Sequence, residues 1–296
     1  MKSSSLMASM AAAVLFAGTG AQAADTLAKI AESGKITLAY RESSVPFSYL
    51  DGPGKPIGFS VELSNAVVEA VKKKLNKPNL QVALMPVTSQ NRIPLITNGT
   101  IDLECGSTTN NTARSKDVAF AINHFYTGTR LLVKKSSKIK DYADLAKKTV
   151  ASTTGTTNVL VMRKYNIEKN LGMNIVLGKD HADSFLLVES DRAVAFAMDD
   201  ILLFGLIANS KTPADFEVVG EPLQVEPYAC MLPKDDPAFK KLVDDTFAGM
   251  MKSGEFEKLY NKWFMQPIPP KNTPLNLPMS PQLKENLKAL SDKPAT

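Results

Sequence analysis

The chain has 296 residues, of which 44% are hydrophobic, and it carries a formal net charge of +5. These values are ordinary for a globular protein with room for two domains of roughly 100 to 200 residues each. The lysines are scattered and lack interleaved aromatic residues, so the mild positive charge does not indicate a nucleic-acid surface. Only two histidines and two cysteines occur, without a CxxC motif, and neither a metal site nor a cofactor is expected.

Residues 1–23 have the layout of a signal peptide. Lys2 precedes an apolar run from Leu6 to Phe16, and Ala21-Gln22-Ala23 provides an A-x-A cleavage site. The alternatives are a membrane anchor, which would need about 20 apolar residues, and a lipoprotein, which would need a cysteine at the cleavage site. We therefore expect a soluble exported protein that begins near Ala24.

Strand-like and helix-like patterns alternate in the first part of the mature chain. Residues 59–75 repeat their apolar side chains with a period near 3.6, which is typical of an amphipathic helix. A further short helix is predicted at 91–101 and ends near Gly99. Strands are predicted at residues 35–43, 80–87 and 101–107. This order predicts a mainly parallel sheet with helices on its faces.

The same alternation recurs downstream, where strands are predicted at residues 129–135, 149–155, 174–180, 192–200 and 227–234. Helices are predicted at residues 140–148 and 156–166, and two amphipathic helices separated by Gly254 at 237–264. The Pro-rich end, residues 266–296, is expected to wrap over the surface before a short helix. Two α/β halves of similar size suggest a ligand cleft between them.

Two polar turns occupy similar positions in the two halves. ECGSTTNNTAR (residues 104–114) and VASTTGTTNV (residues 150–159) both read as a strand, a polar turn and a helix start. Taken alone, the first turn is explained equally well by a loop with a helix N-cap or by an anion site. As a pair, they predict two helix N-termini that face one bound anion.

Charged residues follow several predicted strands. Arg41, Arg92 and Arg114 each lie just beyond a strand end, where ligands bind in open α/β sheets. Any one of them could be a solvated surface charge, but together they indicate a site for carboxylates. Asp199 and Asp200 follow the apolar strand AVAFAM; one is expected to cap a helix and the other to pair with an ammonium group.

Enzymatic chemistry is not favoured by the sequence. Nucleophile elbows, phosphate-binding GxxxxGK[ST] and HExxH motifs are absent. The best catalytic candidate is His181 with Asp180 or Asp183, and no nucleophile accompanies it. The two cysteines, Cys105 and Cys230, can form a disulfide in an oxidising compartment or remain as two buried thiols.

Several segments spread over nearly the whole chain are typical of one known family. They are RESSVPFSYLD, GFSVELSNAVVEAV, TGTTN, KDHADSF, AFAMDD and EPYACMLPKDDPAFKKLVDDT, and the most specific are TSQNRIPL and ECGSTTNN. Through these segments the chain resembles the periplasmic glutamate/aspartate-binding proteins of ABC transporters.

The resemblance implies a type II periplasmic-binding-protein fold, with two lobes, each with a mainly parallel sheet, and two crossover strands. Lobe 1 would comprise residues 24–128 and 228–270, lobe 2 residues 129–227, and residues 271–296 would form an extension packed on lobe 1. In that fold the strand PYACML lies beside the strand DLECGS, which strengthens the disulfide interpretation of Cys105 and Cys230.

The resemblance also implies a ligand site. Arg114, Ser107 and Thr109 would hold the α-carboxylate with N–H groups near Thr157, and Asp199 would take the α-ammonium group. The side-chain carboxylate would be bound by Arg41, Ser89, Arg92 and His181, with Thr156 and Ser43 as neighbours.

The implied function is that of a monomeric binding protein that delivers L-glutamate or L-aspartate to an inner-membrane ABC permease, without nucleic acid as a partner. Two alternatives remain on the same type of fold. One is an enzyme similar to cyclohexadienyl dehydratase, and the other is a sensor domain, which the lack of a later membrane span disfavours.

Overall fold

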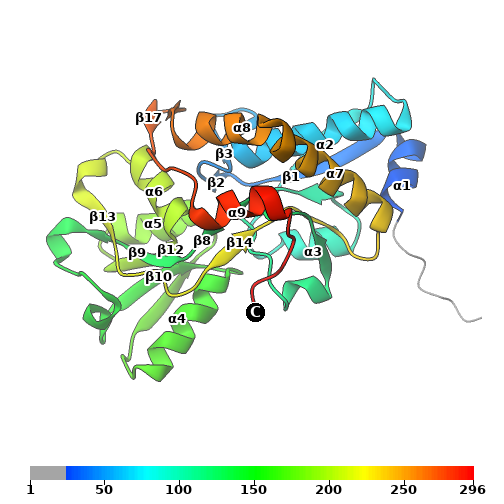
Figure 1. The fold of residues 1–296 in the computed structure, drawn as a ribbon. Helices are drawn as coiled ribbons and strands as arrows, with labels where there is room; N and C mark the ends of the chain where they lie inside the picture. Colours follow the sequence, from blue (N-terminus) through cyan, green and yellow to red (C-terminus); the bar gives the residue numbers. More distant parts are fainter. Residues whose placement is uncertain (1–24) are drawn as a thin grey trace, which may run out of the picture.

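The computed structural model describes residues 25–296, and the predicted signal peptide lies outside the described residues. Within this part of the chain, no helix is both long enough and apolar enough to cross a membrane. Two five-stranded sheets, flanked by helices, occupy the upper right and the lower left of the molecule in Figure 1.

The α-helices of the described residues are α1 (Thr26–Ser33), α2 (Phe59–Leu75), α3 (Arg92–Thr97), α4 (Thr157–Glu168), α5 (His181–Glu189), α6 (Asp200–Asn209), α7 (Pro237–Ser253), α8 (Glu255–Phe264) and α9 (Pro281–Ala289). Helix α2 forms as predicted because its apolar face is buried, with Leu63, Val67 and Val71 fully covered. It packs against α7 and α8.

The first sheet has the strand order β5-β1-β6-β15-β7. Its strands are β5 (Gln81–Pro86), β1 (Lys35–Tyr40), β6 (Leu103–Glu104), β15 (Met231–Pro233) and β7 (Val118–Phe120). Strand β1 is parallel to β5 and β6, and β15 is antiparallel to both β6 and β7. All its strands except β15 therefore run in one direction, and β15 comes from far downstream.

The second sheet repeats this arrangement in the order β11-β10-β12-β9-β13. Its strands are β11 (Asn174–Gly178), β10 (Thr149–Thr153), β12 (Ala195–Asp199), β9 (Thr129–Lys134) and β13 (Phe216–Val219). Strand β10 is parallel to β11 and β12, and β9 is antiparallel to β12 and β13. The prediction of two mainly parallel sheets flanked by helices is confirmed.

Two short strands connect the halves. Strand β8 (Phe125–Thr127) precedes β9 of the second sheet, and β14 (Glu226–Tyr228) precedes β15 of the first. They pair antiparallel, with Glu226 opposite Thr127. The chain thus passes from one sheet to the other and back through one paired ribbon.

A disulfide bond links Cys105 to Cys230, with the Cα atoms 4.3 Å apart. It joins the end of β6 to the residue before β15, so the disulfide prediction is confirmed. The predicted strand 227–234 is interrupted at this point, since β14 ends at Tyr228 and β15 begins at Met231.

The polar run 104–114 does not lead into an α-helix, and this part of the prediction is wrong. Only a short 3-10 turn, Arg114–Lys116, follows the run. The reason is that its backbone pairs elsewhere: Asn110 N–H donates to Pro227 at 2.8 Å and Thr112 N–H to Ala295 at 3.0 Å. Backbone groups that bond to β14 and to the C-terminal segment are not free to form helical hydrogen bonds.

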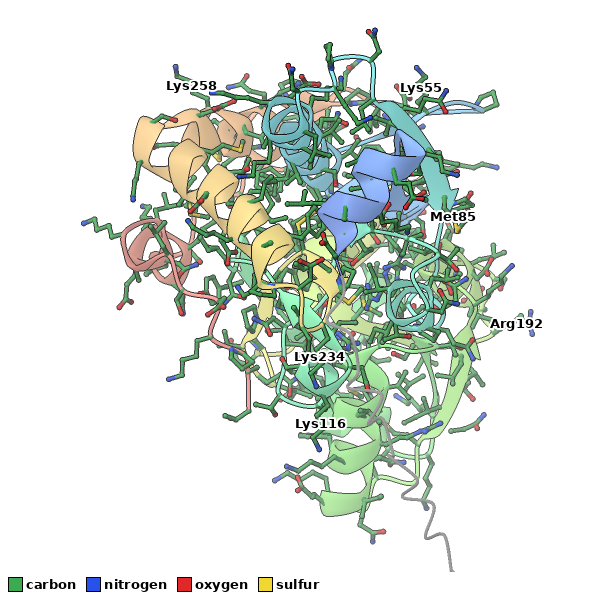
Figure 2. All side chains as sticks on the ribbon, turned by 90° about the vertical axis from the view of Figure 1, so that its right-hand side faces the viewer. Lys55, Met85, Lys116, Arg192, Lys234 and Lys258 are labelled. Carbon is green, nitrogen blue, oxygen red and sulfur yellow. A yellow bond between two sulfur atoms is a disulfide. The ribbon has the colours of Figure 1, made fainter. Side chains whose placement is uncertain are left out.

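Two further details complete the fold. Residues 140–148 hold a 3-10 helix, Tyr142–Leu145, in place of the predicted α-helix. The C-terminal segment contributes α9, which packs on α7 and β8. Charged side chains are spread around the surface, and Lys55, Lys258 and Arg192 are seen at well-separated places in Figure 2.

Candidate functional site

A small cavity lies between the two sheets. It is lined by Ser89, Arg92, Ser107, Thr109, Arg114, Thr156, Thr157, Asn158, His181, Met198, Asp199 and Leu202. These include all the predicted ligand-binding residues except Arg41. Arg41 does not line the cavity but contacts His181, which does. Two larger hollows lie against α9, and their linings lack buried charged side chains.

The residues of the site come together because they lie at or just after the ends of strands. Arg41 follows β1, Arg92 begins α3 after β5, and Thr109 lies in the turn after β6. From the second sheet, Thr157 begins α4 after β10, and Asp199 ends β12. Neighbouring parallel strands end at the same edge of a sheet, which is the usual ligand position in α/β folds.

Buried cations occupy one region of the site. Arg41 is fully buried, and Arg92 is 2% exposed. Arg41 Nη2 donates to Asp180 Oδ1 at 3.0 Å, and Arg92 Nη1 donates to the Ser107 carbonyl at 3.3 Å. Among the described residues, Arg41 Nε and Nη1, Arg92 Nε and Ser89 Oγ have no hydrogen-bond partner. Buried polar groups are normally hydrogen-bonded, so this set of donors points to an oxygen-rich ligand.

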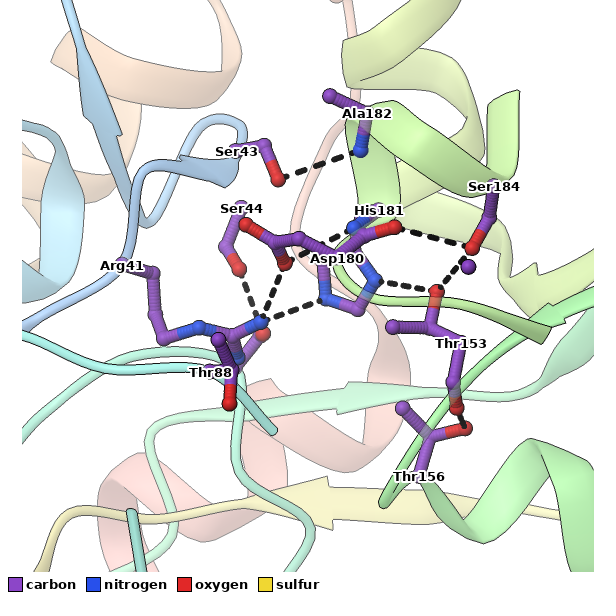
Figure 3. Close-up of polar contacts among 12 residues, drawn as sticks. Arg41, Ser43, Ser44, Thr88, Thr153, Thr156, Asp180, His181, Ala182 and Ser184 are labelled. Carbon is purple, nitrogen blue, oxygen red and sulfur yellow. Dashed lines mark hydrogen bonds and ion pairs between the residues drawn. The ribbon is translucent and has the colours of Figure 1, made fainter. Parts of the chain in front are cut away.

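His181 is held beside Arg41 (Figure 3). Arg41 Nη2 lies 3.2 Å from His181 Nε2, and His181 Nδ1 lies 3.0 Å from Thr153 Oγ1. Since arginine can only donate, Nε2 accepts and Nδ1 carries the proton. Burial, together with Arg41, lowers the pKa of His181 to about 3, so the ring is neutral near pH 7.

Asp180, at the N-terminus of α5, supplies the counter-charge for Arg41. Burial alone would raise the pKa of Asp180, but the neighbouring His181 and Arg41 lower it to about 2. Arg92 has no such ion pair among residues 25–296, and burial followed by the charges of Arg114 and Arg41 lowers its pKa to about 9. Arg92 is thus charged near neutral pH.

Asp199 is a buried carboxylate on the second-sheet side of the cavity. Asn158 Nδ2 donates to Oδ1 at 2.7 Å, and the Tyr228 hydroxyl donates to Oδ2. Burial, and then the nearby Glu226, raise the pKa of Asp199 to about 8. Asp200 points elsewhere, because its Oδ1 accepts from Thr127 Oγ1 at 2.6 Å and from the Ile201 N–H at 2.7 Å. Asp199 is therefore the member of the pair that faces the cavity.

Arg114 spans the gap between the two halves. Its Nη1 donates to the Thr109 carbonyl at 2.9 Å, and its Nη2 donates to the Gly155 carbonyl at 3.3 Å. Gly155 itself lies against Gln90, since an added Cβ would come within 2.6 Å of the Gln90 Cα atom. The loops of the two sheets are thus in direct contact at the rim of the site.

Glu226 belongs to the site but was not predicted. It is 1% exposed, and its Oε2 accepts from the hydroxyls of Thr109 and Thr157, the latter at 2.6 Å. A hydroxyl has one proton, so both threonine hydroxyls are left as acceptors toward a ligand. Asn158 and Tyr228 were missed as well. Their only sequence signal was their place inside the matching segments TGTTN and EPYACM.

Comparison with known proteins gives a family for this chain. Residues 36–266 match the model of the bacterial extracellular solute-binding proteins, family 3. The chain belongs to this family. It is 56% identical to the "Glutamate/aspartate import solute-binding protein" of Escherichia coli (strain K12), over 92% of this chain and 90% of that protein. It is 55% identical to the protein of the same name from Salmonella typhimurium, over 97% and 96% of the two chains.

Solved structures of amino acid-binding proteins share the fold. A mutant of ArgBP from T. maritima superposes with a TM-score of 0.72 at 26% identity, covering 82% of this chain and all of that one. An ancestral amino acid-binding protein, described as a precursor of cyclohexadienyl dehydratase, gives a TM-score of 0.68 at 28% identity, covering 81% and 99%. Both curated relatives are named as solute-binding proteins, so the dehydratase alternative is not favoured.

Proposed function

We propose that this protein captures L-glutamate or L-aspartate in the cavity between its sheets and delivers it to an ABC permease of the inner membrane. High identity to import proteins for these ligands supports the proposal. The observation in the structure that carries it is the set of buried donors without partners on Arg41, Arg92 and Ser89. A ligand with a second carboxylate would satisfy them, whereas a neutral side chain would leave these donors unsatisfied and Arg92 without a counter-charge.

Each part of the ligand would meet a different group of residues. Arg114, Ser107 and Thr109 would bind the α-carboxylate together with N–H groups at the start of α4, which have no partner within the helix. Because the Thr109 hydroxyl donates to Glu226, the backbone of Thr109 would make this contact. Asp199 would take the α-ammonium group, and Arg41, Ser89, Arg92 and His181 the side-chain carboxylate.

The cellular setting belongs to the same proposal. Residues 1–23 would direct export and be removed, and the mature protein would act in the periplasm as a monomer. Residues 24–128 with 228–270 would form one lobe, residues 129–227 the other, and residues 271–296 an extension on the first lobe. The ribbon of β8 and β14 between the sheets supports this division.

The decisive experiment is titration calorimetry of the refolded, ligand-stripped mature chain with L-glutamate, L-aspartate, L-glutamine and L-asparagine. We expect one-to-one binding of the two acids and at least a hundredfold weaker binding of the amides, as expected when buried charges are left unpaired. Equal binding of acids and amides would contradict the assignment of Arg41 and Arg92. Absence of binding to all of them would contradict the proposed function.

A further inference from the structure

One buried carboxylate connects both sides of the cavity. Glu226 begins β14, in the ribbon between the sheets. Its Oε2 accepts the hydroxyl of Thr109, which follows β6 of the first sheet, and the hydroxyl of Thr157, which follows β10 of the second. The Gln224 side-chain amide donates to the other oxygen, Oε1. We call the pair of threonine contacts to Oε2 the Glu226 bridge.

The chemistry of the bridge makes it sensitive to the distance between the sheets. A carboxylate offers only acceptors, and its hydrogen bonds are stronger than those between neutral groups. The two hydroxyl oxygens lie 3.4 Å apart, although they belong to opposite halves of the molecule. Any movement that separates Thr109 from Thr157 must break at least one bond to Glu226, because one oxygen atom cannot follow both.

We propose that Glu226 is a positioning residue that stabilises the closed arrangement of the two halves and turns the hydroxyls of Thr109 and Thr157 into acceptors toward the ligand. The proposal rests on the proposed function, since it assigns Glu226 a part in capture of the same ligand. Glu226 acts through the two threonines and through closure, and the bound amino acid dissociates more slowly as a result.

A local structural role would have a different signature. If Glu226 only fixed the turn before β14 through Gln224, its replacement would lower stability without changing ligand dissociation. It would also show no energetic coupling to Thr157, which lies in the other half of the molecule. Dissociation rate and coupling therefore separate the two roles.

The test compares Glu226→Gln with wild type in calorimetry and in the dissociation rate of radiolabelled L-glutamate. Glutamine keeps the size of the side chain but carries no charge, so its hydrogen bonds to the Thr109 and Thr157 hydroxyls lose the strength that the carboxylate charge gives them. We expect about tenfold weaker and correspondingly faster-dissociating binding, as for loss of a hydrogen bond to a charged group. Glu221→Gln is the matched control, because Glu221 is exposed on the same loop, and it should bind like wild type.

A double-variant cycle completes the test. Thr157→Val removes the hydroxyl and keeps the shape of the side chain. In a chain that already carries Glu226→Gln, this second substitution should weaken binding by less than about another twofold. Wild-type dissociation in Glu226→Gln, or fully additive effects of the two substitutions, would overturn the proposal. If Glu226→Gln does not fold, Thr109→Val and Thr157→Val share the same acceptor and replace it in the cycle.

The cycle is also measured without ligand, by urea unfolding of the same variants. If wild type binds neither L-glutamate nor L-aspartate, the proposed function fails on that result alone. Urea unfolding then tests the Glu226 bridge separately. Non-additive effects of Glu226→Gln and Thr157→Val on the free energy of unfolding support the bridge, and additive effects overturn it.

Discussion

Arg41 and Arg92 are both buried arginines in the same site, yet their surroundings differ. Arg41 already has an ion pair with Asp180 and a contact to His181, whereas Arg92 donates only to a carbonyl group at 3.3 Å. Replacing Arg41 would leave the partly buried Asp180 without its partner, so loss of binding would be mixed with loss of stability. Arg92 is therefore the cleaner probe of the second carboxylate.

Arg92→Ala should weaken L-glutamate binding by about 3 kcal/mol, roughly a hundredfold, because the ligand carboxylate would lose a buried counter-charge. The preference for L-glutamate over L-glutamine should fall by a similar factor. Calorimetry with both ligands measures this change. Arg163→Ala, on the exposed side of α4, is the control and should leave both affinities unchanged. An unchanged preference in Arg92→Ala would contradict the assignment.

Asp199 predicts a pH dependence of binding. With a pKa raised to about 8 by burial and by Glu226, the carboxyl group holds a proton at pH 7, and the ligand ammonium must displace it. Binding should therefore release a proton below pH 8, and affinity should increase from pH 6 to pH 8 and level off above it. Calorimetry in two buffers of different ionisation enthalpy measures the release, and equal heats in both would refute it.

The same carboxyl group affects stability in the opposite direction. Its proton is bound more tightly in the folded chain than in the unfolded chain, so the folded state without ligand loses stability as pH rises from about 4 to 8. Asp199→Asn should remove both the proton release on ligand binding and the loss of stability between about pH 4 and pH 8 that comes from this carboxyl group.

At the scale of single elements, the loop between β10 and α4 limits how closely the halves can approach. Gly155 has φ +79°, and a Cβ atom there would meet the backbone of Gln90 at 2.6 Å. Gly155→Ala should therefore weaken L-glutamate binding by at least tenfold, since backbone atoms must move before the site can close. Gly172→Ala is a matched control, because Gly172 also has positive φ, at +63°, but its nearest neighbouring atom is 3.9 Å away.

Both glycine variants should lose about 1 kcal/mol of stability from the backbone conformation alone. Calorimetry and urea unfolding on the same samples separate this shared loss from the loss of binding. Equal affinities in the two variants would contradict the contact between the halves.

The disulfide acts on the joint between β6 and β15. It spans 125 residues of sequence, so it restricts the unfolded chain over a long loop. Reduction should lower the free energy of unfolding by about 2 to 5 kcal/mol, as measured by urea unfolding with and without reductant. A variant with both Cys105→Ser and Cys230→Ser should show the lower stability and no response to reductant. Unchanged stability on reduction of wild type would refute the expectation.

At the scale of the whole molecule, the site is divided between the two sheets. Arg41, Arg92 and Arg114 come from segments after the first sheet's strands, and His181 and Asp199 from the second sheet. Such a division predicts closure around the ligand. Small-angle X-ray scattering should show a smaller radius of gyration with saturating L-glutamate. The same concentration of L-glutamine should leave the radius of gyration unchanged. An unchanged radius with L-glutamate would contradict closure.

Several features were predictable because they are local in sequence. The period of residues 59–75 determines helix α2, and polar residues after apolar strands indicate the ligand edge of each sheet. Arg92, Arg114 and Asp199 could be selected in this way without knowing their neighbours. The resemblance added the connection between distant segments, including the partner strand that brings Cys230 to Cys105.

The amino-acid sequence by itself determined the alternation of strands and helices and the charges that follow the strands, because both depend on residues close together in the chain. Only the tertiary structure decided which side chains form hydrogen bonds or ion pairs with one another. In the sequence, Glu226 has the pattern of an ordinary strand residue. Its role becomes visible only in the structure, where it bonds to Thr109 of one half and Thr157 of the other. The polar run 104–114 likewise resembled a helix start, and it became an extended segment because β14 and the C-terminal residues supplied its hydrogen bonds. Such contacts join residues far apart in the chain, 69 positions for Glu226 and Thr157 and 117 for Glu226 and Thr109, and a local pattern contains no record of them.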